Sequence, residues 1–301
     1  MHRSFPIDAS ADGTPADRYL SSRLQGWSLK RARWALRHGR VVSDRRRLEP
    51  DSMLVRGETL TILPDPAPRE RPPRPPTPPL LHESPGLLGV DKPSGLLMHP
   101  IGADFQWGLI NLVRGDFPGE DLHLGHRLDR ETSGVCLLAR GKESNAALKA
   151  AFKAREVTKT YWALVRGNPR WDSTVVDAAI GPEEGPIRIK MALREDGRPA
   201  YTRFRVLHRG PSCALVSCRP TTGRTHQLRL HLASLGHPIL GDRLYGQDPD
   251  LFLDLFEGRH VPDLRARLGH PRQCLHARAI HWGEVTVRAP MPADMAARLR
   301  A

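Results

Sequence analysis

Proline is concentrated in one short stretch of the chain, and this stretch limits how the whole sequence can fold. Nine prolines fall within residues 64–79, interrupted by several charged residues. Proline lacks the backbone N–H that helices and sheets require, so neither element can pass through this segment. A chain of 301 residues is also long enough for more than one domain. We therefore predict a small domain over 1–63, an extended linker or surface belt over 64–80, and a large domain over 81–301.

The sequence carries a strong excess of positive charge. It has 46 Lys and Arg against 33 Asp and Glu, which gives a net charge of +13 and an isoelectric point near 10.3. Most of these cations are arginines, whose planar guanidinium binds phosphate and stacks on bases. We therefore expect a nucleic-acid partner. An arginine-rich genome composition is the alternative source of the excess.

Cysteine and histidine spacing indicates no metal site. The four cysteines form no C-x2-C pair, and His226 and His231 are five residues apart, which misses the helical zinc-pair spacing. We expect neither a metal nor another cofactor, and we predict buried, reduced thiols. The sequence has no long apolar run and no apolar leader, so we expect a cytoplasmic protein without a membrane segment.

The small domain is predicted to contain two helices followed by short strands. Ser28 is a suitable N-cap for a helix that Gly39 ends, with Leu29, Ala32 and Leu36 on its apolar face. The cations of this helix lie largely off that face: Lys30, Arg31, Arg33 and Arg37. They can bind RNA, although a solvated basic helix without a ligand has the same pattern. The whole segment 53–63 is predicted as a strand.

The large domain alternates strand-like runs with turns. We predict strands at 87–90, 135–139, 161–165, 174–180, 201–207 and 214–218, and helices at 144–155 and 225–235. The acidic segment 248–257 is predicted as a surface helix. Many strands and few helices argue against parallel βαβ winding and favour an α+β fold with a mixed sheet.

The densest group of charged residues is 126–134, with the sequence HRLDRETSG, directly before the predicted strand at 135–139. Asp129 stands between Arg127 and Arg130. Neighbouring cations favour the carboxylate form, and an ionised carboxylate can act as a nucleophile. A surface loop of ion pairs explains the same spacing.

A second cluster lies in 222–231, where a Gly-Arg turn leads into the predicted helix. Arg224, His226 and Arg229 fall on or near the first helical turn, where polar side chains can bind a phosphate or hold a catalytic carboxylate.

The third cluster lies on the predicted strand around 158–165, where Lys159 and Tyr161 share one face. Tyr161 can stack on a base. A half-buried tyrosine in a sheet is the alternative interpretation.

Together these clusters resemble the RluA family of pseudouridine synthases, over most of the large domain and in the family's order. The matching segments are VDKPSGL at 90–96, HRLDRETSG at 126–134, KTY at 159–161, GRTHQLR at 223–229, GHPILGD at 236–242 and LHA at 275–277. The small domain resembles the S-four-like RNA-binding domain in the order of ADRYL at 16–20, the basic helix, GRVV at 39–42 and VRGE at 55–58. It departs at 42–44, where Val-Ser-Asp replaces the usual Val-Asn-Gly.

The resemblance implies an α+β pseudouridine synthase fold with a mixed, largely antiparallel sheet, preceded by a small α+β RNA-binding domain. It implies that Asp129 is the nucleophile, that Tyr161 lies against the target base and that Arg229 pairs with the Asp129 carboxylate. Arg127 would help to extrude the uridine. The other implied substrate-binding residues are His126, Lys159, Arg224 and His226. The family needs no cofactor. Attack at the ribose and attack at the base ring both stay open.

The implied substrate is structured RNA, with large-subunit ribosomal RNA ahead of transfer RNA, and the protein is expected to be a monomer. Two other functions remain as alternatives. One is a non-catalytic RNA-binding or ribosome-assembly protein with the same fold. The other is a hydrolase that uses two carboxylates on a nucleoside or sugar, for which Glu131 is the near second carboxylate.

Overall fold

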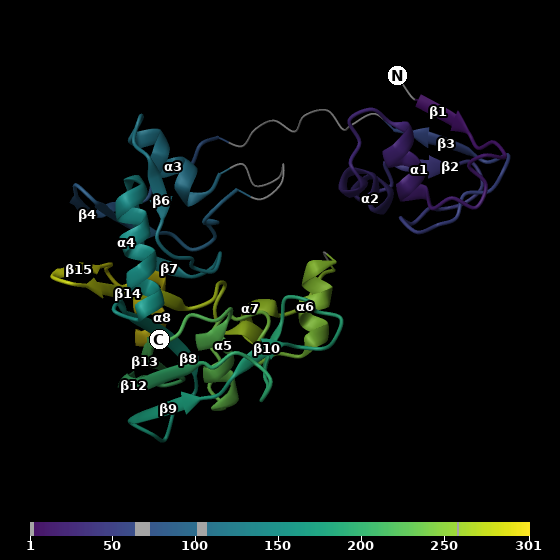
Figure 1. Cartoon of the computed structure of the whole chain (residues 1–301). Coiled ribbons are helices and arrows are strands. Elements are labelled where there is room, and N and C mark those ends of the chain that lie inside the picture. The colour runs from purple at the N-terminus through teal and green to yellow at the C-terminus, as the bar shows by residue number, and fades with distance from the viewer. Residues whose placement is uncertain (1–2, 64–72, 101–106, 258) are drawn as a thin grey trace. The chain divides into compact units, whose positions relative to one another are not determined.

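The chain divides within its proline-rich segment into two units, 1–72 and 73–301, each with its own hydrophobic core (Figure 1). The computed structural model describes residues 3–63, 73–100, 107–257 and 259–301. The predicted linker lies outside the described residues up to position 72, and its last residue, Leu80, already begins a strand.

The small unit pairs two helices with a three-stranded antiparallel sheet. The helices are α1 (Ala16–Arg23) and α2 (Leu29–Arg37), and the strands are β1 (Arg3–Pro6), β2 (Val41–Ser43) and β3 (Thr59–Ile62), in the order β1-β3-β2. Ser28 caps α2, since its side chain accepts a hydrogen bond from the Arg31 N–H at 3.2 Å. Ala32 and Leu36 are buried as predicted, but Leu29 is exposed.

Two sequence expectations for this unit were wrong. The strand β1 was not expected, although it pairs with β3 along its whole length. The strand expected over the whole of 53–63 begins only at Thr59, because Gly57 turns the chain with a φ of +83°.

The large unit is built on a ten-stranded sheet. Eight of its strands follow the order β4-β5-β7-β14-β8-β13-β12-β9, with β6 paired to β7 and β15 paired to β14. The bounds are β4 (Leu80–Ser84), β5 (Leu87–Lys92), β6 (Leu122–Leu124), β7 (Ser133–Arg140), β8 (Thr158–Arg166), β9 (Ser173–Asp177), β12 (Tyr201–Arg209), β13 (Cys213–Pro220), β14 (Leu275–Trp282) and β15 (Val285–Arg288). The pair β7–β14 is parallel and the other pairs are antiparallel, so the predicted mixed α+β class is confirmed.

The strand predicted at 174–180 is divided in the structure. β9 ends at Asp177, and Ile180 begins β10 (Ile180–Pro182), which pairs with β11 (Met191–Leu193) in a separate two-stranded sheet. The backbone leaves the large sheet at this point because Ala178 and Ile180 bond to Ala200 and Arg198 instead.

Six helices accompany the sheet of the large unit. They are α3 (Leu109–Asp116), α4 (Gly141–Ala154), α5 (Gln227–Ser234), α6 (Pro249–Phe256), α7 (Leu264–Leu268) and α8 (Ala293–Arg300). Leu148 of α4 packs on Val135 and Leu137 of β7, and Leu228 and Leu232 of α5 belong to the core around β8 and β13. The predicted helices at 144–155, 225–235 and 248–257 correspond to α4, α5 and α6.

The four cysteines are buried free thiols, as predicted. None of the helices in the ranges described above is both long and apolar enough to cross a membrane.

Candidate active site

The site is assembled where β14 lies between β7 and β8. Ala277 of β14 pairs with Gly134 of β7 on one side and with Tyr161 of β8 on the other. Gly134 has a φ of +106°, and a β-carbon there would lie 2.3 Å from the Ala277 carbonyl oxygen. Glycine permits this close approach. The loop that precedes β7 therefore ends one strand away from Tyr161.

The loop that leads into β7 is fixed by the segment after β5. The buried Lys92 ammonium donates to the carbonyl oxygens of Pro93, Leu96 and Arg130 at 2.9, 2.7 and 3.0 Å. Burial lowers the pKa of Lys92 to about 8. Three carbonyl acceptors offset the loss of its hydration, because a buried ammonium needs partners for its N–H groups. Lys92 thus ties the loop to β5 beside Asp129.

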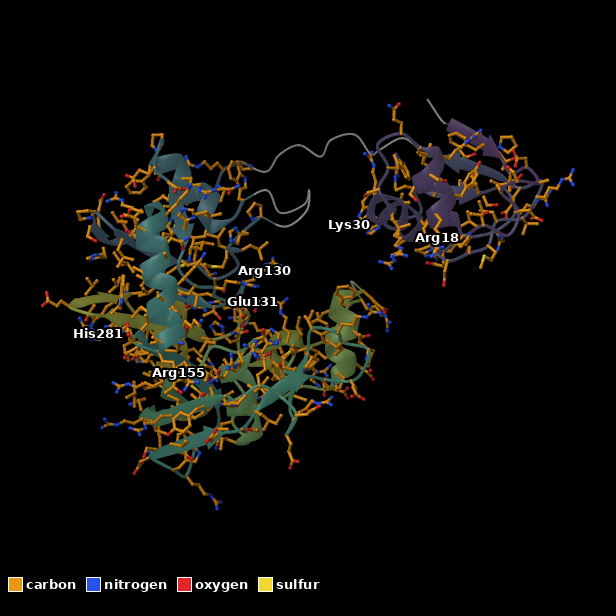
Figure 2. All side chains as sticks on the ribbon, viewed as in Figure 1. Arg18, Lys30, Arg130, Glu131, Arg155 and His281 are labelled. Atoms are coloured by element: carbon orange, nitrogen blue, oxygen red, sulfur yellow. The ribbon has the colours of Figure 1, made fainter. Side chains whose placement is uncertain are left out.

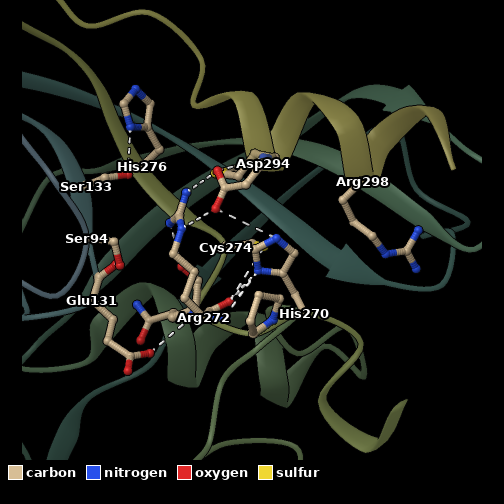
Figure 3. A network of polar contacts seen from close by, with 12 residues as sticks. Ser94, Glu131, Ser133, His270, Arg272, Cys274, His276, Asp294 and Arg298 are labelled. Carbon is tan, nitrogen blue, oxygen red and sulfur yellow. Dashed lines mark hydrogen bonds and ion pairs between the residues drawn. The ribbon is translucent and has the colours of Figure 1, made fainter. Parts of the chain in front are cut away.

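Further contacts join the same loop to the segment that enters β14 (Figure 3). The Glu131 carboxylate accepts from the Gln273 backbone N–H at 3.2 Å, and Ser133 Oγ lies 3.0 Å from His276 Nδ1. Next to Gln273, Arg272 pairs with Asp294 of α8 through two contacts of 2.5 and 2.7 Å. The loop is therefore braced against the segment that enters β14.

Arg229 of α5 connects two carboxylates. Its Nε and Nη2 donate to Asp242 Oδ2 and Oδ1 at 2.6 and 2.9 Å, while its Nη1 lies 3.5 Å from Asp129 Oδ2. Asp242 is fully buried and also accepts from the backbone N–H groups of Leu244 and Tyr245. Burial lowers the pKa of Arg229, but the contacts with Asp242 and Asp129 raise it above its usual value, so the guanidinium stays charged. One edge of the cation is fixed, and its remaining nitrogen faces Asp129.

The turn before α5 is ordered by buried Gln227. Its Oε1 accepts from Thr222 Oγ1 at 2.8 Å and from the Arg224 backbone N–H at 3.0 Å. His226 has a φ of +57°, a strained conformation for a residue with a β-carbon. Its Nδ1 lies 3.0 Å from the Tyr245 hydroxyl, and burial together with a nearby guanidinium lowers the pKa of His226 to about 4. The imidazole is therefore neutral at pH 7.

These elements surround a pocket with a volume of about 120 Å³. The pocket brings together Asp129, Tyr161 and Arg229 from three distant parts of the sequence. Its wall also contains four of the residues that the resemblance assigns to substrate binding: Arg127, Lys159, Arg224 and His226.

Burial shifts the pKa of two ionisable groups in this pocket. Burial raises the pKa of Tyr161 and the Asp129 carboxylate raises it further, so the hydroxyl keeps its proton. Burial lowers the pKa of Lys159, whose Nζ donates to the Thr222 carbonyl at 3.1 Å. Tyr161 therefore presents a neutral ring and hydroxyl beside the carboxylate.

His126 contacts β7 and is not among the residues that line the pocket of Asp129. Its Nε2 accepts from the Leu137 backbone N–H at 3.1 Å, and burial lowers its pKa to about 4. Its ring lies 5.3 Å from the ring of Phe152 and lines a second pocket next to the first. The structure thus gives His126 a role in fastening the loop to β7, which sequence reasoning had not assigned to it.

The four cations expected to bind RNA all lie on α2 of the small unit, and each is exposed (Figure 2, which labels Lys30). Two of them have intramolecular partners. Arg33 Nε contacts the buried Asp17 carboxylate at 2.7 Å, and the Arg31 guanidinium lies 5.3 Å from the centre of the Trp27 ring.

Sequence reasoning missed Asp242 and Tyr245, which shape the site from behind Arg229. Asp242 stands at the end of the GHPILGD segment, but no spacing rule connects it to a helix 13 residues earlier. An unexplained carboxylate at the end of a matching segment was the available signal. Within the part of the chain that the structure describes, no group of three or more His, Cys, Asp or Glu is arranged to hold a metal ion.

Comparison with known proteins finds relatives along most of the chain. A family model described as RNA pseudouridylate synthase matches residues 86–234. The chain is 31% identical to ribosomal large subunit pseudouridine synthase C of Vibrio vulnificus, over 95% of this chain and 90% of that protein. It is 38% identical to ribosomal large subunit pseudouridine synthase D of Nitrosomonas europaea, over 74% of this chain but only 64% of that protein. Among solved structures, human RNA pseudouridylate synthase domain containing 1 superposes with a TM-score of 0.58 at 29% identity, covering 73% of this chain and 86% of that one.

Proposed function

The chain belongs to the family of RNA pseudouridylate synthases and is therefore an isomerase that acts on RNA, and we propose that it modifies large-subunit ribosomal RNA with Asp129 as its nucleophile. The observation that carries the proposal is the arrangement of Asp129 opposite the fixed Arg229 cation in a pocket walled by Tyr161. The names of the bacterial relatives support ribosomal RNA as the substrate.

The reaction exchanges one bond for another within the nucleotide. The bond from N1 of the uracil to C1′ of the ribose breaks, the base turns, and a bond from C5 to C1′ forms. The proton on C5 leaves and N1 gains one, so the formula does not change. A group that holds the base or ribose during the turn is needed, and a carboxylate can form a covalent intermediate at either partner.

We assign the roles as follows. Asp129 attacks, with its negative charge compensated by Arg229 across 3.5 Å. Tyr161 supplies a ring surface against the target base. Arg127 is exposed at the mouth of the pocket, where it can help to take the place of the uridine once that base leaves its stack. The other cations of the pocket wall can bind the phosphates that flank it.

In this proposal each part of the chain has its own function. Residues 81–301 carry out catalysis, 64–80 serve as the linker, and 1–63 act as an S-four-like RNA-binding domain through Lys30, Arg31, Arg33 and Arg37. The exposure of these four cations and the net charge of +13 support this assignment. A monomer in the cytoplasm, where ribosomes are modified, completes the proposal.

Pseudouridine mapping tests the function directly. Purified protein is incubated with transcribed ribosomal RNA without added metal, and the products are mapped by carbodiimide treatment and primer extension. RNA from cells with and without the gene is mapped in parallel. We expect one or more uridines of the large-subunit RNA to be modified only when the protein is present. Modification of transfer RNA instead would correct the substrate, and no modified uridine in either RNA would contradict the enzymatic proposal.

A further inference from the structure

A second pocket adjoins the pocket of Asp129. Its volume is about 540 Å³, against about 120 Å³ for the first. The two pockets share a wall that includes Lys159, Tyr161 and Arg224. An RNA strand whose uridine occupies the first pocket must pass through adjacent space, because the nucleotides are covalently linked.

The second pocket is strongly positive. Five cations line it, namely Arg127, Lys153, Arg155, Lys159 and Arg224, and none of its described lining residues is Asp or Glu. Burial lowers the pKa of Arg224, and the charges of Arg198 and Arg155 lower it further. Cations gathered without a carboxylate form a site whose charge an anionic ligand would neutralise.

The same pocket offers a ring surface for a base. Phe152 of α4 and His126 lie with their ring centres 5.3 Å apart at 40°. His126 is held by the Leu137 N–H, and Phe152 is partly buried against the core that contains Leu148. Rings fixed in this way can stack on a base at little cost in side-chain entropy.

Arg155 follows α4 in an unusual backbone conformation. Its φ of +64° lies in the left-handed region, which at helix ends is normally taken by glycine because a β-carbon is disfavoured there. A cation near the helix C-terminus has a stabilising role, but Lys153 in the last turn already provides one. Strained backbone conformations of this kind are concentrated at functional sites, so the strain at Arg155 points to a ligand-binding role for its side chain. Figure 2 labels Arg155 beyond the end of α4.

We propose that the C-terminal end of α4 binds the nucleotide next to the target uridine in the RNA strand. Its phosphate is bound by Lys153 and Arg155, and its base packs on Phe152. This inference rests on the proposed function, since it takes RNA as the substrate, and it adds residues that no part of the resemblance contains.

Arg155→Gly separates this role from a structural one. Glycine removes the side chain and relieves the left-handed backbone, so the variant should unfold at the same temperature as the wild type or higher. Its affinity for transcribed large-subunit ribosomal RNA, measured by filter retention, should nevertheless fall. Loss of one phosphate contact should reduce the slope of log affinity against log salt by roughly 0.7. Lys149→Ala, which removes an exposed lysine of α4 outside the pocket, should change neither quantity by as much.

Phe152→Leu tests the base contact while keeping an apolar side chain in the core. Stacking on an aromatic ring contributes ~1–3 kcal/mol per base, so RNA affinity should fall about fivefold or more with an unchanged salt slope. Equal affinities and slopes for Arg155→Gly, Phe152→Leu and Lys149→Ala would overturn the inference. Filter retention reports RNA binding and not pseudouridine formation. A failure to form pseudouridine would therefore count against the proposed function, whereas the RNA affinities of these variants test the inference about α4 separately.

Discussion

Replacement of Asp242 by asparagine tests whether Asp129, the proposed nucleophile, depends on a residue on the far side of Arg229. Asp242 holds the Arg229 guanidinium by two hydrogen bonds of 2.6 and 2.9 Å, which leaves Nη1 facing Asp129 at 3.5 Å. Asparagine keeps the shape of the side chain but loses its charge. Arg229 would then have Asp129 as its one remaining carboxylate among these contacts and should move toward it.

The size of the effect follows from the contacts. Asparagine has one acceptor oxygen and its amide nitrogen only donates, so one of the two hydrogen bonds from Arg229 is lost. A hydrogen bond to a charged group contributes ~1.5–3 kcal/mol, so the free energy of unfolding should fall by about 2–3 kcal/mol. Misplacement by about 1 Å near reacting atoms can cost on the order of 100-fold in rate. We therefore expect Asp242→Asn to reduce the single-turnover rate at saturating RNA by about that factor, with RNA affinity retained.

Single-turnover kinetics and urea unfolding should be measured on the same preparations. Asp196→Asn is the matched control, because Asp196 binds Arg194 with the same two-bond geometry on an exposed segment outside the pocket. The control should keep the wild-type rate. If Asp242→Asn loses stability but keeps its rate within about twofold, Asp242 only supports the fold and the positioning argument is refuted.

Three further predictions concern the fold and the small domain. Gly241→Ala should lower the free energy of unfolding by more than about 3 kcal/mol, since its β-carbon would lie 1.7 Å from the Arg272 carbonyl oxygen. The control is Gly236→Ala, at a glycine that is also left-handed but has open space around it. Its free energy of unfolding should fall by only about 1–2 kcal/mol in the same urea titration. Burial lowers the pKa of His276 to about 4, whereas a histidine in an unfolded chain has a pKa of about 6.5. As the pH falls, the unfolded chain therefore takes up the proton first. The free energy of unfolding should decrease between about pH 6.5 and pH 4, by up to ~1.4 kcal/mol per pH unit. His276→Asn should flatten this dependence in urea titrations across that range, and an unchanged slope would contradict the assignment. Deletion of residues 1–63 should weaken RNA binding and flatten its salt dependence, and a salt slope equal to that of the full chain would remove the RNA-binding role of the small domain.

The sequence predicted much of the fold because its main strands and helices have strong local patterns. Residues 135–139 are a continuous apolar run, which predicts a buried strand. Leu228 and Leu232 of α5 are four residues apart, which places them on one face of a helix. Both are buried in the structure as this pattern requires. The short strands β1, β6, β10 and β11 have three or four residues each, too few for a period to stand out. Their pairing depends on partners that are distant in sequence.

The candidate site was only partly predictable for the same reason. Asp129 and Arg229 are 100 residues apart, and no property of either segment places them within 3.5 Å. That pairing came from the family resemblance. The support from Asp242 and the pocket at the end of α4 depend on tertiary packing, so no local pattern could reveal them.

Release of tritium from RNA labelled at C5 of its uridines tests the central claim most directly, because forming the bond from C5 to C1′ expels that hydrogen. The wild-type protein should release one tritium for each pseudouridine found in the product. Asp129→Asn should release none above background while it still binds the RNA. Release by Asp129→Asn at a rate comparable with the wild type would contradict the assignment of Asp129 as the nucleophile.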